Sequence, residues 1–230
     1  MNILGVIPAR AGSKGVPGKN LIEIGGRSLI ERAVASALES ERLSRVLFTT
    51  EDAGYRDIAL KAGAEAPFLR PAELATDTAG TWDVMRHAVN WLEENEGWST
   101  DYLVVLQPTT PFRTGAHIDA TIALVLDEGA EAALSIREVD YPPQWMMLRE
   151  SNGRMKPLIE GGPKVSRRQD AATVYQPNGL VYVLPRARLD HADPIMVTDK
   201  RGYIMDFADS INIDDPWQVD LARIIEAKRA

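Results

Sequence analysis

Short apolar runs alternate with amphipathic segments along this chain, and that alternation restricts its fold more than any other feature. Apolar runs of strand length lie at residues 2–9, 45–51, 101–111 and 132–139. Segments with apolar residues at helical spacing lie at 28–41, 55–64, 81–95 and 117–129. Strands that are apolar throughout and joined by helices are typical of parallel sheets. We therefore expect an α/β, Rossmann-like fold: a mostly parallel central sheet with helices on both faces.

The alternation stops near residue 140, where Pro, Gly and Arg become frequent. Two short runs, QWMMLRES and RMKPLIE, flank Asn152-Gly153, a pair typical of β-hairpin turns. A buried strand, GLVYVLP, resumes at Gly179. We expect a single domain, 1–230, with a hairpin-containing excursion at about 140–170. The excursion contains an apolar cluster of four residues: Trp145, Met146, Met147 and Leu148. This cluster either contacts a second copy of the chain or covers the chain's own sheet, and both roles stay open.

Composition narrows the class of protein. The chain has 230 residues, of which 45% are hydrophobic, and this suits one domain with a sizeable core. Its net charge of -7 argues against a general nucleic-acid or membrane surface. It has no cysteine, which excludes disulfides, thiolate zinc sites and a cysteine nucleophile. No apolar run approaches membrane-spanning length, so we expect a cytoplasmic protein with no nucleic-acid and no membrane partner.

The loop after the first apolar run concentrates glycine and positive charge in the sequence ARAGSKGVPGKN, residues 9–20. Ligands of open parallel sheets bind beyond the carboxyl ends of the strands, where this loop should lie. Glycines let backbone N–H groups approach an anion closely, and Arg10 and Lys19 add full charges. The Walker A and GxGxxG patterns are absent. The loop therefore predicts another type of polyphosphate site, with a solvated glycine-rich turn as the alternative.

This loop resembles the nucleotide-binding signature of the sugar-acid cytidylyltransferases, and in particular of the acylneuraminate cytidylyltransferases, the CMP-sialic acid synthetases. Four further motifs match in the same order: LRPAELATDTAGT, LQPTTPFRTGAHI, QPNGLVYV and DSINIDDPWQVDLA. The resemblance implies an enzyme that transfers CMP from CTP to the anomeric hydroxyl of a 2-keto-3-deoxy sugar acid, with Mg²⁺ and release of pyrophosphate. It also implies a homodimer. Activation of another sugar with a different NTP, and a non-catalytic nucleotide-binding module, stay open as alternatives.

The resemblance also assigns roles to individual residues. It implies electrostatic catalysis by Arg10 and Lys19 and a metal-binding role for Asp214. The implied nucleotide-binding residues are Ala9, Arg10, Ala11, Gly12, Ser13, Lys19, Asn20, Arg70, Ala79 and Thr81. The implied sugar-acid residues are Gln107, Arg168, Gln169, Tyr175 and Asn178. A surface ion pair with Glu73 is the structural alternative for Arg70.

The sequence departs from the family pattern at two positions. Asn212 stands where the family more often has a first metal-binding aspartate, so Asp214 is the expected main Mg²⁺ ligand and Asn212 offers a neutral carbonyl. Gln176 stands where the family often has an arginine, which leaves the identity of the sugar acid open. Asp215 is expected to cap a helix that begins at Pro216.

Overall fold

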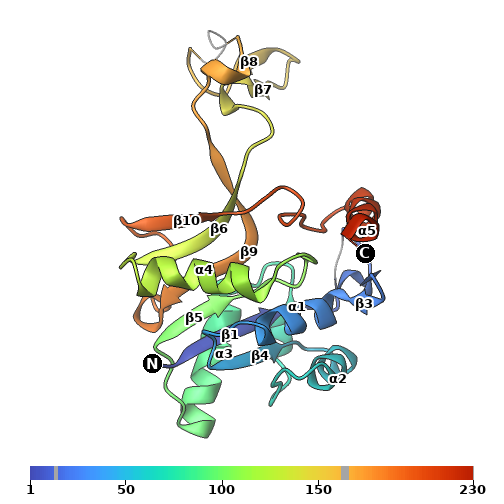
Figure 1. Ribbon diagram of the computed structural model, residues 1–230, viewed down its shortest axis with the longest axis vertical. Coiled ribbons are helices and arrows are strands. Elements are labelled where there is room, and N and C mark those ends of the chain that lie inside the picture. The colour runs from blue at the N-terminus through green and yellow to red at the C-terminus, as the bar shows by residue number, and fades with distance from the viewer. Residues whose placement is uncertain (13–14, 162–165, 230) are drawn as a thin grey trace.

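The computed structural model describes residues 1–12, 15–161 and 166–229. In this part of the chain a six-stranded sheet forms the centre, in the order β10-β6-β9-β5-β1-β4 (Figure 1). The strands are β1 (Ile3–Pro8), β4 (Arg45–Thr49), β5 (Tyr102–Val105), β6 (Ala132–Glu138), β9 (Tyr175–Pro185) and β10 (Lys200–Ile204). β9 runs antiparallel to β5 and β6, whereas β1–β4, β1–β5 and β6–β10 are parallel pairs. The predicted mostly parallel sheet is confirmed, and β10 is an additional edge strand.

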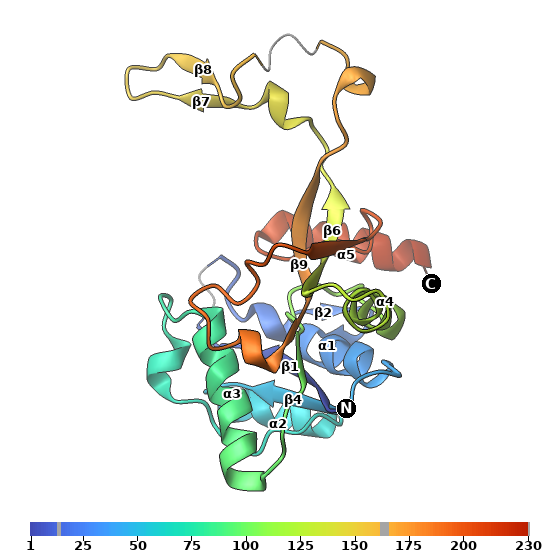
Figure 2. The same ribbon diagram turned by 90° about the vertical axis from the view of Figure 1, so that its left-hand side faces the viewer.

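Helices cover both faces of the sheet, as predicted. They are α1 (Leu29–Leu38), α2 (Ala53–Lys61), α3 (Thr81–Glu96), α4 (Gly115–Leu126) and α5 (Pro216–Arg229). Buried residues of α1, α2 and α4, such as Ile30 and Ile118, share one core with Phe48 of β4. Those of α3, such as Leu92, share another with Leu4 of β1. Figure 2 shows α3 on one side of the sheet and α1 and α4 on the other.

The C-terminal helix packs apart from these two layers. α5 shares a small core with Ile24 of a two-stranded sheet, β2 (Glu23–Ile24) and β3 (Arg27–Ser28), and with Phe112. This packing carries the segment that precedes α5 towards the opening loop. Within the described residues, no helix combines the length and apolar character needed to cross a membrane.

Side-chain caps set where the helices begin. Ser28 starts α1 with a capping box in which it accepts from the Glu31 N–H while the Glu31 carboxylate accepts from the Ser28 N–H. α4 begins with a related box, in which Thr114 N–H donates to His117 Nδ1 at 3.3 Å and His117 N–H donates to Thr114 Oγ1 at 3.4 Å. An unprotonated Nδ1 is therefore part of the start of α4.

Acid should destabilise the protein through His117. Burial lowers the pKa of His117 although Asp209, 3.7 Å from Nε2, opposes the shift. The unfolded chain then binds its proton at a higher pH than the folded chain, so stability is full above the ordinary histidine pKa and falls as pH drops through the folded value. His117→Gln keeps the acceptor without the titration. Urea unfolding at pH 7 and pH 5 should show a smaller acid loss in the variant than in wild type, and an equal loss would contradict the role.

The predicted excursion is an arm between β6 and β9, described at residues 139–161 and 166–174, that projects from the body of the molecule (Figures 1 and 2). It carries the predicted hairpin as β7 (Met147–Arg149) and β8 (Met155–Pro157), with Gly153 at the turn at φ 86°. The apolar cluster Trp145, Met146, Met147 and Leu148 is 38 to 44% exposed. Figures 1 and 2 show β7 and β8 away from the six-stranded sheet, so the cluster does not cover that sheet.

Candidate functional site

Two clefts adjoin at the edge of the sheet where β1, β4, β5 and β6 end. The first, about 260 Å³, lies beyond β1 and β5, and the second, about 500 Å³, lies beyond β6 and beside the start of β9. Gln107, two residues after β5, lines both clefts. This is the edge at which open α/β sheets bind ligands, as the sequence predicted for the opening loop.

Most of the predicted nucleotide-binding residues meet in the first cleft. Those that line it are Ala9, Arg10, Lys19, Asn20, Arg70, Ala79 and Thr81. Thr81 is the first residue of α3, so the positive end of that helix dipole lies at the cleft wall. Ala11 and Gly12 continue the loop beyond the lining residues, and Ser13 lies outside the described residues. Residues from two separate sequence motifs thus line one cleft.

Glu51 ties the opening loop to Arg70. Its Oε1 accepts from the Ala11 N–H at 2.8 Å, and its Oε2 accepts from Arg70 Nη2 at 2.7 Å. Arg70 also donates to the Ala9 carbonyl at 3.1 Å, and it is buried. The ion pair of Arg70 is therefore an internal one with Glu51 that holds the base of the loop, and a surface pair with Glu73 is not what the structure shows.

Several polar atoms of the first cleft have no partner in the described chain. Asn20 donates from Nδ2 to the Arg10 carbonyl at 3.1 Å, but its Oδ1 is buried without a donor. Arg70 Nε is a buried donor without an acceptor, and Thr109 Oγ1 is also unpaired. Buried polar groups are nearly always hydrogen-bonded in proteins, so unpaired ones beside a cleft indicate a wall built for a polar ligand.

Arg10 bridges the mouth of the first cleft. Its Nη1 donates to Asp77 Oδ1 at 2.5 Å, and both side chains are more than a third exposed. Asp77 follows the short helix η2 (Ala72–Ala75), on the side of the cleft opposite the opening loop. An ion pair this exposed contributes about 0–1 kcal/mol, so a phosphate group can displace Asp77 from Arg10 at low cost.

Lys19 and Asp214 meet where the two clefts adjoin. Lys19 lines the first cleft and Asp214 the second, and Nζ donates to Oδ1 at 2.9 Å. The residues are 195 positions apart in the sequence. Gly15 makes the approach possible, because a Cβ there would lie 2.5 Å from the Asp214 carbonyl oxygen. One of the opening-loop glycines is therefore needed for contact with the α5 segment.

Asp215 directly precedes α5, the position expected for a cap, and the Gln218 side chain makes capping bonds at this helix start. The Gln218 side-chain oxygen accepts from the backbone N–H groups of Asp214 and Asp215, each at 2.7 Å. This is the reciprocal half of a capping box. It fixes the backbone at Asp214 and leaves that carboxylate directed at Lys19.

In the second cleft the predicted residues Asn178 and Asn212 have different surroundings. Asn178 Oδ1 accepts from Ser135 Oγ at 2.6 Å, and its Nδ2 donates to Ser210 Oγ at 3.0 Å. Its amide is thus engaged by the protein interior and positions β9 against the loop before α5. Asn212 Oδ1 is buried without a partner in the described chain. Of the two amides, Asn212 is therefore the one whose oxygen can bind a ligand.

The remaining predicted sugar-acid residues lie on the arm or at its base. Arg168 and Gln169 line a third cavity of about 390 Å³, where Arg168 is 3.5 Å from Glu138. Tyr175 begins β9 opposite Glu138 and is exposed. Within one chain these residues are therefore not gathered around Gln107 in the two adjoining clefts, and their sugar-binding role stays a prediction.

Three charged residues of the site escaped the sequence analysis: Glu51, Arg113 and Arg137. Glu51 is the last residue of the apolar run predicted at 45–51 and follows β4 by two residues, and this position at the carboxyl edge was a usable signal. Arg113 is buried and donates to the carbonyls of Gln107 at 2.8 Å and Leu180 at 2.9 Å. Burial lowers the pKa of Arg113 to about 9. Its bonds hold the Gln107 loop against β9, and only the folded chain reveals them.

Comparisons with known proteins agree with this geometry. A family model described as cytidylyltransferase matches residues 4–177. N-acylneuraminate cytidylyltransferase of Escherichia coli O18:K1:H7 is 30% identical over 99% of this chain, which spans about half (52%) of that protein. CMP-N,N'-diacetyllegionaminic acid synthase of Legionella pneumophila is 29% identical over 94% of this chain and 92% of its own length.

A solved structure shows the same fold. CMP:2-keto-3-deoxy-manno-octonic acid synthetase, in complex with CTP, superposes with a TM-score of 0.73 over the whole of both chains at 16% identity. The family model covers most of the chain, from β1 to the start of β9, and includes the opening loop and Gln107. This chain therefore belongs to the cytidylyltransferase family.

Proposed function

We propose that the protein transfers CMP from CTP to the anomeric hydroxyl of a 2-keto-3-deoxy sugar acid and releases pyrophosphate. The observation that carries the proposal is the Lys19–Asp214 contact of 2.9 Å at the junction of the two clefts. A group-transfer enzyme needs two substrate sites that meet at the reacting atom. Here a cation from the first cleft and a carboxylate from the second meet at that junction.

The first cleft suits a nucleoside triphosphate. Arg10 and Lys19 supply positive charge, and the unpaired Asn20 Oδ1 and Arg70 Nε supply one acceptor and one donor, as a pyrimidine and its ribose require. Thr81 and the backbone at Ala79 lie at the same wall. We assign this cleft to CTP, in line with the activities that the names of the relatives state.

In the reaction the sugar hydroxyl oxygen bonds to the α-phosphorus, the bond from that phosphorus to the bridging oxygen breaks, and pyrophosphate leaves. The hydroxyl proton passes to solvent. Charge grows on the departing phosphates, and Lys19 and Arg10 are placed to neutralise it. Both pair with carboxylates of the protein, Lys19 with Asp214 and Arg10 with Asp77. Binding of CTP therefore replaces two protein carboxylates by phosphate oxygens.

Mg²⁺ is the metal that the donor set suits. The Asp214 carboxylate and the unpaired Asn212 Oδ1 are hard oxygen donors, which Mg²⁺ prefers together with phosphate oxygens and water. In the described residues no group of three or more His, Asp or Glu side chains could hold a metal unaided. We propose that Asp214 and Asn212 hold the ion and that it offsets triphosphate charge when bound.

We further propose that the active form is a homodimer built through the arm. Its exposed cluster Trp145, Met146, Met147 and Leu148 has the aromatic and methionine content typical of protein interfaces. Arg168 and Gln169 lie on the same arm. A neighbouring chain would bring them to its partner's second cleft, which would reconcile their position with a sugar-binding role.

A turnover screen tests the proposed reaction. Pyrophosphate release should occur with CTP and at least one of a panel of eight- and nine-carbon 2-keto-3-deoxy sugar acids, and it should need Mg²⁺. The same panel with ATP, GTP and UTP is the matched control. Preference for another NTP would favour activation of a different sugar, and CTP binding without turnover on any acid would favour a non-catalytic module.

A further inference from the structure

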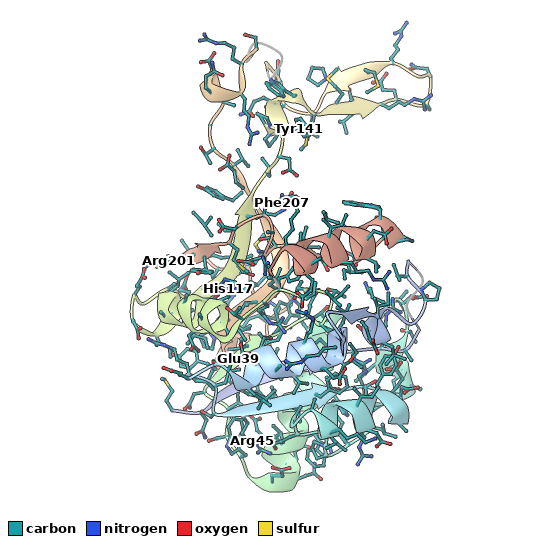
Figure 3. The ribbon with its side chains drawn as sticks, turned by 45° about the vertical axis from the view of Figure 1, so that its right-hand side comes forward. Glu39, Arg45, His117, Tyr141, Arg201 and Phe207 are labelled. Carbon is teal, nitrogen blue, oxygen red and sulfur yellow. The ribbon has the colours of Figure 1, made fainter. Side chains whose placement is uncertain are left out.

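The wall of the second cleft combines one positive charge with aromatic rings. Among the described residues that line this cleft, Arg137 is the only cation, and Asp140 and Asp214 are the carboxylates. Phe207 and Trp217 line it and are more than half exposed. Figure 3 places Phe207 at the base of the arm, close to α5. Aromatic rings and amides beside one cation suit a ligand with apolar and hydroxylated faces and a single acid group.

Arg137 is held in place by its neighbours. It lies on β6 in register with Gln176 of β9, and with the Gln176 oxygen turned towards it, Nε and Nη2 donate at 3.0 and 2.9 Å. The Phe207 ring centroid is 5.2 Å from its Cζ. A guanidinium fixed on one edge and stacked on one face loses little freedom when its remaining edge binds a ligand.

That remaining edge pairs with a carboxylate of the protein itself. Arg137 Nη1 and Nη2 donate to Asp140 Oδ1 and Oδ2 at 3.3 and 3.1 Å, a two-bond pairing. Asp140 belongs to the arm and its side chain is 53% exposed, so the pair is easily exchanged. Asp140 thus occupies the position that a ligand carboxylate would take, with the geometry that such a group prefers.

We propose that Arg137 is the specificity-determining residue that binds the carboxylate of the sugar acid, and that Asp140 holds this position until the acid displaces it. The proposal rests on the proposed function, because it assigns the second cleft to the acceptor. It also links acceptor binding to the arm, since the displaced carboxylate lies two residues after β6 ends. Arg168 is the competing candidate, because it lines a small cavity together with Arg137 at the arm base.

The test compares wild type and an Arg137 variant on two substrates, the charged acid and its uncharged methyl ester. Arg137→Gln should raise KM for the best acid of the screen about ten- to a hundredfold, the range for a lost charged hydrogen-bonding partner, and leave KM for CTP within about twofold. With the methyl ester of the same acid, wild type and variant should have equal KM. Asp140→Asn should lower KM for the acid, because it removes the competing carboxylate. Arg223→Gln, which breaks an exposed pair with Asp220 on α5, is the matched control and should change nothing.

Each contrary result has a distinct meaning. Equal losses on acid and ester would show that Arg137 only clamps the strands, and a loss confined to Arg168→Gln would assign the carboxylate to Arg168; either overturns the proposal. If wild type turns over no acid, the proposed function fails on its own. Trp217 fluorescence then reports binding of N-acetylneuraminate and of its methyl ester, and an acid preference that survives Arg137→Gln would again overturn the assignment.

Discussion

Replacing Lys19 by Ala is expected to lower kcat about a hundredfold, which corresponds to about 3 kcal/mol of lost transition-state stabilisation. The ammonium lies at the junction of the two clefts, where the departing phosphates develop charge. Folding should change far less than turnover, because Asp214 is 59% exposed and solvent weakens its pair with Lys19, whose side chain is 14% exposed. Steady-state kinetics at saturating CTP, together with urea unfolding, measure both effects.

Asp214→Asn should abolish Mg²⁺-dependent turnover with the fold intact, because an amide is a poor magnesium ligand compared with a carboxylate. Asp215→Asn is the matched control. It lies at the same helix start and contacts Gln218 through its backbone: its N–H donates to the Gln218 side chain, and its carbonyl accepts from the Gln218 N–H. Equal losses in the two variants would mean that the substitution disturbs the start of α5. A magnesium titration of Asp214→Asn that overlays wild type would remove Asp214 from the metal site.

A further large effect is expected on assembly. Placing aspartate at both Met147 and Leu148 should convert a dimer into monomers, because two charges would be buried in the proposed interface. Turnover should fall together with the dimer fraction. Leu60→Asp is the matched control, since Leu60 of α2 is 43% exposed, close to the 43 and 44% of the two arm residues. Light scattering gives the mass. A monomeric wild type at working concentration would contradict the dimer.

Mixing two inactive variants tests whether the dimer shares its sites. If each site takes Lys19 from one chain and Arg168 from the other, a heterodimer of Lys19→Ala and Arg168→Ala chains has two different sites. One site carries both substitutions, and the other carries neither. Activity should therefore partly return after subunit exchange. No return, despite exchange proven by mass, would show that each site is complete within one chain and that the arm serves assembly alone.

The sheet and helix layers of this fold could be predicted from sequence because the spacing of apolar residues within each segment determines whether it forms a strand or a helix. Apolar runs of strand length predicted β1, β4, β5 and β6, and helical spacing predicted α1 to α4. The hairpin followed from Asn152-Gly153, and Gly153 does take a positive φ. The opening loop was placed at a ligand cleft because the carboxyl edge of a parallel sheet is where its loops converge.

Contacts between distant segments were decided by tertiary structure alone. No periodicity relates Lys19 to Asp214 or Glu51 to Arg70, since these pairs form only after β1 pairs with β4 and the segment before α5 packs against the opening loop. Strand register likewise decides that Arg137 faces Gln176, because a shift by one residue would turn the side chain to the other face. The sequence thus determined which chemistry the chain carries, and the packing of remote segments determined which groups act together.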